Sequence, residues 1–330
     1  MTAPHRLTAE IYTEGILRGD RLTLSRAITL IESTLPSDQQ LATEIIRNCL
    51  PYTGNAYRVG ITGVPGVGKS TFIDGFGSFL ISEKLRVAVL AVDPSSSRSG
   101  GSILGDKTRM EKLAASSQAF IRPSPSGGNP GGVARKTRES ILLCEAAGYE
   151  MILIETVGVG QSEISVFSMV DFFLLLLLPH AGDELQGIKR GIMEMADGLI
   201  IHKADGVMQA AARQAQTAYS QAIRLFNHDS PDWRPQIIPC SSLTGKGYPE
   251  IGNMLNQYKT LTLKNGFWEQ KRSLQLNQWL KEAIEQQLLN SFYSHPRVVS
   301  RLEELSREVA DKRLSPTEAA EILLKTMGES

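Results

Sequence analysis

The chain has 330 residues, and its 35 Lys and Arg residues balance 35 Asp and Glu residues. This length suits one large α/β domain with helical additions, and the zero net charge argues against a nucleic-acid or anionic-membrane partner. The longest apolar run, residues 172–178, is far shorter than the roughly 20 residues that cross a bilayer. The N-terminus has no apolar stretch of signal-peptide type, and the three cysteines are scattered. We therefore expect a cytosolic (cytoplasmic) protein without a disulfide framework.

The first predicted element is a helical lead-in that ends near residue 49. Its apolar residues fall at helical spacing, and Leu24, Ala27, Ile28 and Ile31 form the clearest group. Pro51 and Gly54 then interrupt the pattern.

Seven short apolar runs follow and alternate with helical stretches. In chain order they read RVGITG, RVAVLAVD, AFIRP, MILIET, FFLLLLL, GLIIHK and QIIPCS. Unbroken apolar runs suit strands buried on both faces, and their alternation with helices is typical of a doubly wound, mainly parallel sheet. After about Pro249 only helical patterns remain. We predict an α/β fold with N- and C-terminal helical extensions: a lead-in at 1–55, a sheet-containing core at 56–262 and a helical extension at 263–330.

The first run leads into a phosphate-binding motif. Residues 63–70, GVPGVGKS, have the spacing of a P-loop, and they follow a predicted strand and open a predicted helix, as this motif requires. In such a loop the backbone N–H groups and the positive end of the helix face the phosphates. The Lys bridges the outer phosphates and the Ser hydroxyl ligates Mg²⁺. The predicted residues are Gly63, Gly66, Val67, Gly68, Lys69 and Ser70.

Two acidic residues stand at the ends of later apolar runs: Asp93 follows VAVLAV, and Glu155 follows MILI. Ligands of doubly wound folds bind at the carboxyl ends of the strands, so either carboxylate is placed to hold Mg²⁺ directly or through water. A strand-ending acid can also be a simple cap, but beside a phosphate loop we favour the metal role. Gly158 lies three residues after Glu155, where its N–H can contact the terminal phosphate only before hydrolysis, as a switch requires.

The motif HKAD, at residues 202–205, predicts which base is bound. Asp205 can accept both N1–H and the N2 amino group of guanine, a donor pair that adenine lacks, while the Lys203 stem covers the ring. Ser241 and Ser242 follow the last run, where a backbone loop supports the guanine carbonyl. These residues favour GTP and GDP over ATP. His202 stands where most GTPases carry Asn, which could weaken guanine affinity.

Together with GGSILGDKTRM and AGDELQGIKRGIMEMAD, these motifs resemble the MeaB/ArgK family of GTPase chaperones associated with methylmalonyl-CoA mutase. The resemblance covers nearly the whole chain. It implies a P-loop GTPase core at 56–262, a homodimer joined largely by the C-terminal helices, and a role in protecting, loading or reactivating an adenosylcobalamin-dependent acyl-CoA mutase. It also implies that residues 182–189 form a mobile segment that couples the nucleotide to the mutase. The phosphate, metal and switch residues implied by motif are Lys69, Ser70, Thr71, Asp93, Asp106, Glu155 and Gly158.

The residue that positions the attacking water is left open. Val159 follows Gly158 where Ras-like proteins have Gln, so we expect slow hydrolysis that a partner stimulates. Gln161 and Lys189 are the candidates for orienting water or stabilising charge, alongside Lys69 and Glu155. Their plainer interpretations, a loop residue and an exposed helix cation, are equally open. In the family a Gly often stands where this chain has His180.

Three other functions compete with this prediction. An ATPase or kinase linked to transport of basic amino acids is disfavoured by Asp205, and a metal-insertion GTPase would need a metal-collecting cluster, whereas the histidines are scattered. A purely structural helical scaffold would bind no nucleotide. The segment LQLNQWLKEAIEQQLL is more apolar than a free surface helix should be, which independently favours a homodimer.

Overall fold

The computed structural model describes residues 7–92, 110–123, 130–156, 162–179, 190–226, 230 and 232–328. The chain divides into two compact units, Met1–Ser273 and Leu274–Ser330. The N-terminal helices belong to the first unit, and the three-part division predicted from the sequence stays a prediction. Among the described helices none is long and apolar enough to cross a membrane.

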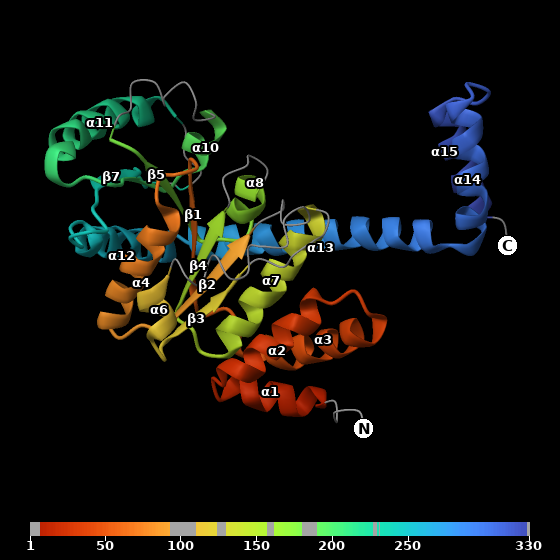
Figure 1. Cartoon of the computed structure of the whole chain (residues 1–330), viewed down its shortest axis with the longest axis horizontal. Coiled ribbons are helices and arrows are strands. Elements are labelled where there is room, and N and C mark those ends of the chain that lie inside the picture. Colours follow the sequence, from red (N-terminus) through yellow and green to blue (C-terminus); the bar gives the residue numbers. More distant parts are fainter. Residues whose placement is uncertain are drawn as a thin grey trace. The chain divides into compact units, whose positions relative to one another are not determined.

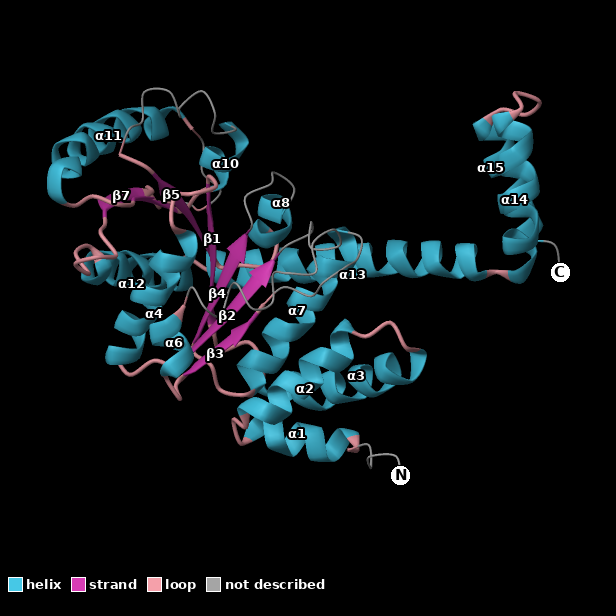
Figure 2. Cartoon of the chain, in the orientation of Figure 1, coloured by secondary structure: helices cyan, strands magenta, loops and turns pink. Residues whose placement is uncertain are grey.

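A seven-stranded sheet forms the centre of the first unit (Figures 1 and 2). Its order is β3-β2-β4-β1-β5-β6-β7, and every neighbouring pair of strands is parallel. The predicted doubly wound α/β fold is confirmed, and each of the seven apolar runs is one of these strands. The run at residues 172–178 is an interior strand, since it pairs with β1 on one side and β6 on the other, and all residues of the strand are buried. The strands are β1 Tyr57–Gly63, β2 Val87–Val92, β3 Ala119–Arg122, β4 Met151–Thr156, β5 Phe172–Leu177, β6 Gly198–Ile201 and β7 Gln236–Pro239.

Helices cover both faces of the sheet. Helices α4, α6 and α12 pack on one face, where Ile61 and Leu174 point, and α7, α8, α10 and α11 pack on the other, where Ile154 and Phe173 point. The helices are α4 Lys69–Ser82, α6 Glu111–Ala115, α7 Pro130–Ala146, α8 Ser162–Phe167, α10 Arg190–Met195, α11 Gln209–Ala222 and α12 Tyr248–Lys264. Short 3-10 helices are η1 Leu50–Tyr52, η2 Gly206–Met208 and η3 Ile223–Leu225.

Three helices precede the sheet and confirm the helical lead-in: α1 Ala9–Leu17, α2 Arg21–Glu32 and α3 Pro36–Cys49. The carboxylate of Asp20 caps α2 by accepting from the backbone N–H groups of Leu22 and Thr23 at 3.2 and 3.1 Å. The predicted apolar group on α2 is fully buried and joins the core between α7 and the sheet.

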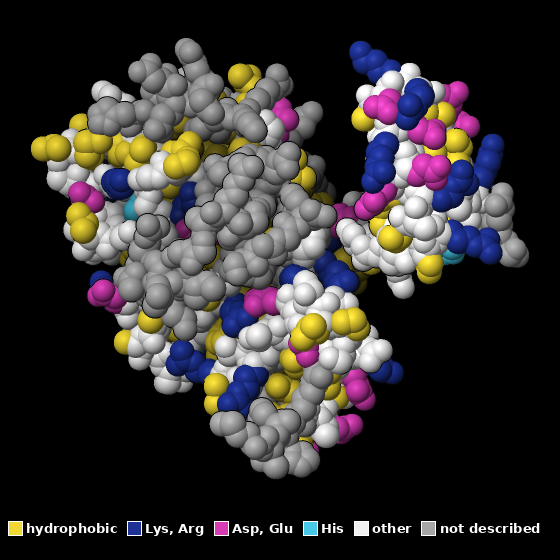
Figure 3. All heavy atoms as spheres, turned by 45° about the vertical axis from the view of Figure 1, so that its right-hand side comes forward, with side chains coloured by type: hydrophobic (Ala, Val, Ile, Leu, Met, Phe, Trp, Pro, Cys, Tyr) yellow, Lys and Arg dark blue, Asp and Glu magenta, His cyan; other side chains and the backbone are white. Residues whose placement is uncertain are grey.

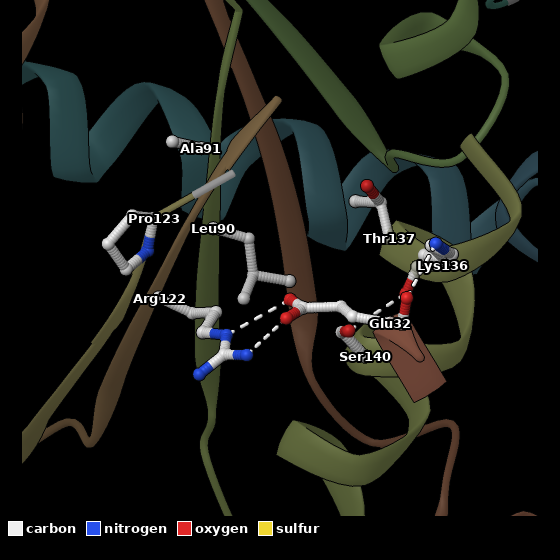
Figure 4. Close-up of a pocket in the computed structure, with 8 residues that line it drawn as sticks. All are labelled: Glu32, Leu90, Ala91, Arg122, Pro123, Lys136, Thr137 and Ser140. Atoms are coloured by element: carbon white, nitrogen blue, oxygen red, sulfur yellow. Dashed lines mark hydrogen bonds and ion pairs between the residues drawn. The ribbon is translucent and has the colours of Figure 1, made fainter. Parts of the chain in front are cut away.

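A small pocket lies at the carboxyl ends of β2 and β3, beside α2 and α7 (Figure 4). Arg122 donates through Nε, at 3.0 Å, and through Nη2 to the carboxylate of Glu32, and the Lys136 ammonium donates to the Glu32 carbonyl oxygen at 2.7 Å. These bonds tie the last turn of α2 to the sheet edge at which doubly wound folds bind their ligands. The other lining residues are Leu90, Ala91, Pro123, Thr137 and Ser140.

Helix α13, Phe267–Ser294, is anchored to the first unit by its first turns. Arg272 forms an ion pair with the carboxylate of Asp171 through two bonds of 2.7 Å, and it also donates to the carbonyl oxygens of Gly54 and Ala56. The neighbouring Lys271 donates to the carboxylate of Asp197 at 3.3 Å. Since Asp171 and Asp197 directly precede β5 and β6, this network attaches the helix to the amino ends of both strands.

The second unit contains the rest of α13, α14 Pro296–Ala310 and α15 Pro316–Gly328. Its small core consists of Val298, Leu305, Ala319 and Leu323. Positive and negative side chains are intermingled on the surfaces of α14 and α15 (Figure 3). A reciprocal capping box between Ser315 and Glu318, with bonds of 3.1 and 3.2 Å, starts α15.

Candidate functional site

The predicted phosphate loop connects the end of β1 to the start of α4, in the middle of the sheet. Gly66 and Gly68 have φ angles of +80° and +95°, a left-handed conformation that only glycine adopts without strain. A Cβ at Gly68 would also approach the ring of His202 to 2.9 Å. Residues in this conformation turn successive backbone N–H groups toward one side, which makes a concave anion-binding surface.

Lys69, the first residue of α4, folds back over this loop. Its ammonium donates to the carbonyl oxygens of Gly63 and Val64 at 2.8 and 3.4 Å, and the side chain is buried. Burial lowers the pKa of Lys69, whereas the carboxylates of Glu155 and Glu163 act in the opposite direction. The cation therefore lies at the phosphate loop, between the backbone and two acids.

The structure brings two predicted metal ligands together. The Ser70 hydroxyl, in the first turn of α4, donates to the Glu155 carboxylate at 3.1 Å, and Glu155 lies near the carboxyl end of β4. A hydroxyl and a carboxylate form the all-oxygen donor set that Mg²⁺ prefers, so these two residues fit that ion. In the part of the chain that the structure describes, there is no group of three or more His, Cys, Asp or Glu side chains placed to hold a metal.

The predicted base-recognition residues lie after β6 and β7. The Ser241 hydroxyl donates to the Asp205 carboxylate at 2.5 Å, which holds that acceptor in one orientation. Lys203 has a φ of +58°, an uncommon conformation for a residue with a side chain, and its ammonium donates to the carbonyl oxygen of Gly66 at 2.9 Å. The base-recognition loop is therefore hydrogen-bonded directly to the phosphate loop through Lys203.

Several predicted residues lie outside the described part of the chain, and their roles stay predictions. They are Asp93, Asp106, Gly158, Gln161, His180 and Lys189, together with the rest of the segment 182–189. Thr71 is described and is exposed on α4.

The sequence analysis missed one buried acid beside the site. Glu163, in the first turn of α8, is 3% exposed, and its charge acts on Lys69. Only its place in the sequence, shortly after Glu155 at the end of residues 155–163 (ETVGVGQSE), could have drawn attention to it. Tyr248, the first residue of α12, packs closely on α4, because a Cβ at Gly75 would come within 2.0 Å of its hydroxyl.

The family described as "Methylmalonyl Co-A mutase-associated GTPase MeaB" matches residues 24–297 of the chain. The chain belongs to this MeaB family. The resemblance inferred from the motifs is thus confirmed, and the GTPase expectation is supported at the level of the family.

Known proteins similar to this MeaB-family chain cover almost all of it. "GTPase ArgK" from Escherichia coli is 46% identical over 278 residues, which is 84% of both chains. "Methylmalonic aciduria type A homolog, mitochondrial" from Mus musculus is 45% identical over 330 aligned positions, and the match covers 97% of this chain and 79% of that protein. A crystal structure described as "LAO/AO transport system kinase" is 36% identical with a TM-score of 0.76, and it covers 99% of this chain and 100% of its own.

Proposed function

We propose that the protein is a cytosolic GTPase chaperone that assembles, protects or reactivates an adenosylcobalamin-dependent acyl-CoA mutase, with methylmalonyl-CoA mutase as the first candidate. The observation that carries the proposal is the joined site: the Ser70–Glu155 contact, the loop around Lys69 and the Asp205–Ser241 bond occur in a chain of a family described as mutase-associated.

The site residues have separate tasks in this proposal. The loop N–H groups and Lys69 bind the outer phosphates, and Asp205 selects guanine. Ser70 and Glu155 hold Mg²⁺, which when bound neutralises charge that develops on the phosphates. Gln161 and Lys189 remain the candidates for positioning water and stabilising charge. The Lys69 ammonium exchanges its backbone acceptors for phosphate oxygens when the nucleotide binds.

We also propose that hydrolysis is slow in the isolated protein and that the mutase accelerates it. Supplying a missing positioning or charge-stabilising group in trans can increase the rate by roughly 10³–10⁵-fold. The segment 182–189 is rich in charge and glycine, which suits a segment that a partner orders. Its Lys189 and Asp183 are the residues to test.

The experiment measures GTP turnover with and without purified methylmalonyl-CoA mutase. We expect wild type to be stimulated, and Lys189→Ala and Asp183→Ala to lose stimulation. Lys325→Ala, an exposed cation of α15, is the matched control and should behave as wild type. No stimulation of the wild-type protein would refute the partner assignment, while full stimulation of both variants would remove the segment from the coupling.

A homodimer formed through α13 is part of the same proposal. The helix has only one buried side chain, Trp268 at its start, and seven of its apolar side chains from Leu274 onward are half or more exposed. These are Leu274, Leu276, Leu280, Ile284, Leu288, Leu289 and Tyr293. So many exposed apolar side chains on one helix favour an interface.

Light scattering tests the dimer. We expect wild type to have twice the mass of one chain and a variant with Leu280→Glu and Ile284→Glu to have the mass of one. Leu243→Glu, at an 84% exposed position of the first unit, is the control and should stay dimeric. A truncation after Ser273, which keeps the Arg272 anchor, should also be monomeric. A monomeric wild type would contradict the proposal.

A second candidate is an ATPase or kinase linked to transport of basic amino acids, because the solved relative described as a transport system kinase is 36% identical. The two candidates differ in the nucleotide that they use. Tight ATP binding without measurable GTP binding would favour the second.

A further inference from the structure

A pocket with a volume of about 210 Å³ lies beside the edge strand β7, between α11 and the start of α12. Part of its lining is apolar, and its charged lining residues are Arg213, Lys246 and Glu250. None of the residues that the sequence analysis assigned to nucleotide binding lines this pocket. The pocket is therefore separate from the candidate nucleotide site.

The chain on one side of this pocket carries no acidic residue. Residues 206–225, which include η2, α11 and η3, contain no Asp or Glu, although acids make up 35 of the 330 residues. Arg213 is the only charged residue of α11. The side chains of Arg213 and Lys246 are exposed and form no ion pair with any described residue. Since Glu250 is the only acid in the lining, the two cations leave the pocket with a net positive charge.

The same region carries the three most exposed large apolar side chains among the described residues. Val207 in η2 is 94% exposed, Leu225 in η3 is 83% exposed and Leu243 after β7 is 84% exposed, whereas the others are at most 64% exposed. Val207 and Leu243 follow the carboxyl ends of the neighbouring strands β6 and β7, so they lie at the same edge of the sheet as the pocket. Exposed apolar side chains beside a charge-poor helix are typical of a protein–protein interface, whose centre is depleted of charged residues.

The edge strand β7 itself offers little to the backbone of a partner. Gln216 of α11 donates from Nε2 to the carbonyl oxygen of Ile237 at 2.7 Å, and Pro239 has no backbone N–H. A partner that added a strand here would find this acceptor occupied and one donor missing. Docking must therefore use the side chains around the pocket.

We propose that an acidic segment of a partner protein docks on this surface, with a carboxylate against Arg213 and Lys246 and an apolar side chain against Val207. This inference rests on the proposed function and assigns the surface to the mutase. Helix α10, which directly follows the proposed coupling segment 182–189, packs in the same apolar cluster as α11, so the surface is close to the end of that segment. Cations without a partner suit a carboxylate because charge-assisted hydrogen bonds are stronger than neutral ones. The zero net charge of the chain and the acid Glu250 argue against a polyanion such as nucleic acid.

The experiment measures binding of purified methylmalonyl-CoA mutase to the full chain by biolayer interferometry. Placing an acid opposite the docked carboxylate should raise the Kd of Arg213→Glu by about 10–100-fold. Loss of one buried apolar side chain should raise the Kd of Val207→Ser by about tenfold. Arg47→Glu makes the same charge change at an exposed position of α3, and this matched control should bind as wild type does. All variants should keep the GDP affinity of the wild type.

Glu250→Gln tests the sign of the charge effect, since a gain in affinity cannot come from damage to the fold. Removing the acid from the pocket should tighten mutase binding by up to about fivefold, and wild-type binding should weaken more steeply with salt than that of Arg213→Glu. Wild-type affinity in both Arg213→Glu and Val207→Ser, or weaker binding by Glu250→Gln, would overturn the inference. A changed mass of Arg213→Glu in light scattering would also overturn it, because the surface would then join copies of this chain. A wild-type protein that binds no mutase would refute the proposed function itself, and this inference with it.

Discussion

Exchanging Asp205 for Asn should change the base preference from guanine to xanthine, because the substitution preserves shape and alters one hydrogen-bonding group. Ser241, which is 1% exposed, donates to one carboxylate oxygen of Asp205. In the variant we expect the same hydroxyl to donate to the remaining amide oxygen. The amide nitrogen then faces the base, where it meets the N–H donors of guanine but can donate to the O2 acceptor of xanthine.

The size of the effect follows from the bonds that are lost. Asp205 offers guanine two hydrogen bonds to a charged acceptor, and each such bond contributes about 1.5–3 kcal/mol. Losing both costs about 3–6 kcal/mol, which corresponds to roughly a 10²–10⁴-fold weaker GTP complex. Xanthine gains one neutral hydrogen bond, of about 1 kcal/mol, from the Asn amide. The variant should therefore bind XTP more tightly than GTP.

Competition binding with GTP and XTP against a fluorescent nucleotide measures both preferences. Asp311→Asn, at an exposed position after α14, is the matched control and should bind GTP as wild type does. An unchanged ratio of GTP to XTP affinity in Asp205→Asn would remove this residue from base recognition. Equal weakening for both nucleotides would show that the bond to Ser241 supports the fold rather than orienting an acceptor.

Three further predictions concern catalysis, stability and pH. Lys69→Ala should lower GTP turnover by about 10²–10³-fold in a phosphate-release assay, with an unchanged circular dichroism spectrum. Arg272→Ala should lower the free energy of unfolding by about 3–5 kcal/mol in urea titrations because it leaves Asp171 buried and unpaired, whereas Arg307→Ala, at an exposed site, should change it by less than about 0.5 kcal/mol. Burial lowers the pKa of His202 from its usual 6.5, so the unfolded chain binds this proton first as pH falls. The contribution of neutral His202 to the stability of the folded protein should be present above pH 6.5 and decrease as the pH falls below that value. Thermal melting of wild type and His202→Asn across this pH range isolates that contribution.

The sequence predicted those elements whose structure depends on residues close together in the chain. The seven strands are unbroken apolar runs between turn residues, and burial on both faces of a parallel sheet requires such runs. The phosphate loop needs glycines at a fixed spacing, because they adopt a backbone conformation that no other residue adopts without strain. The capping box of Ser315 and Glu318 needs only residues three positions apart. Each of these patterns lies within a few residues of the chain.

What the tertiary structure alone decided is which distant residues meet. Val67 and His202 are separated by 135 positions, and Asp171 and Arg272 by 101. Chain order does not reveal such contacts, because they depend on β1 lying between β4 and β5, with β6 next to β5. The sequence therefore determined the motifs and the family, whereas only the packing of the strands placed His202 between Val67 and Ser242 and placed the buried Glu163 beside Lys69.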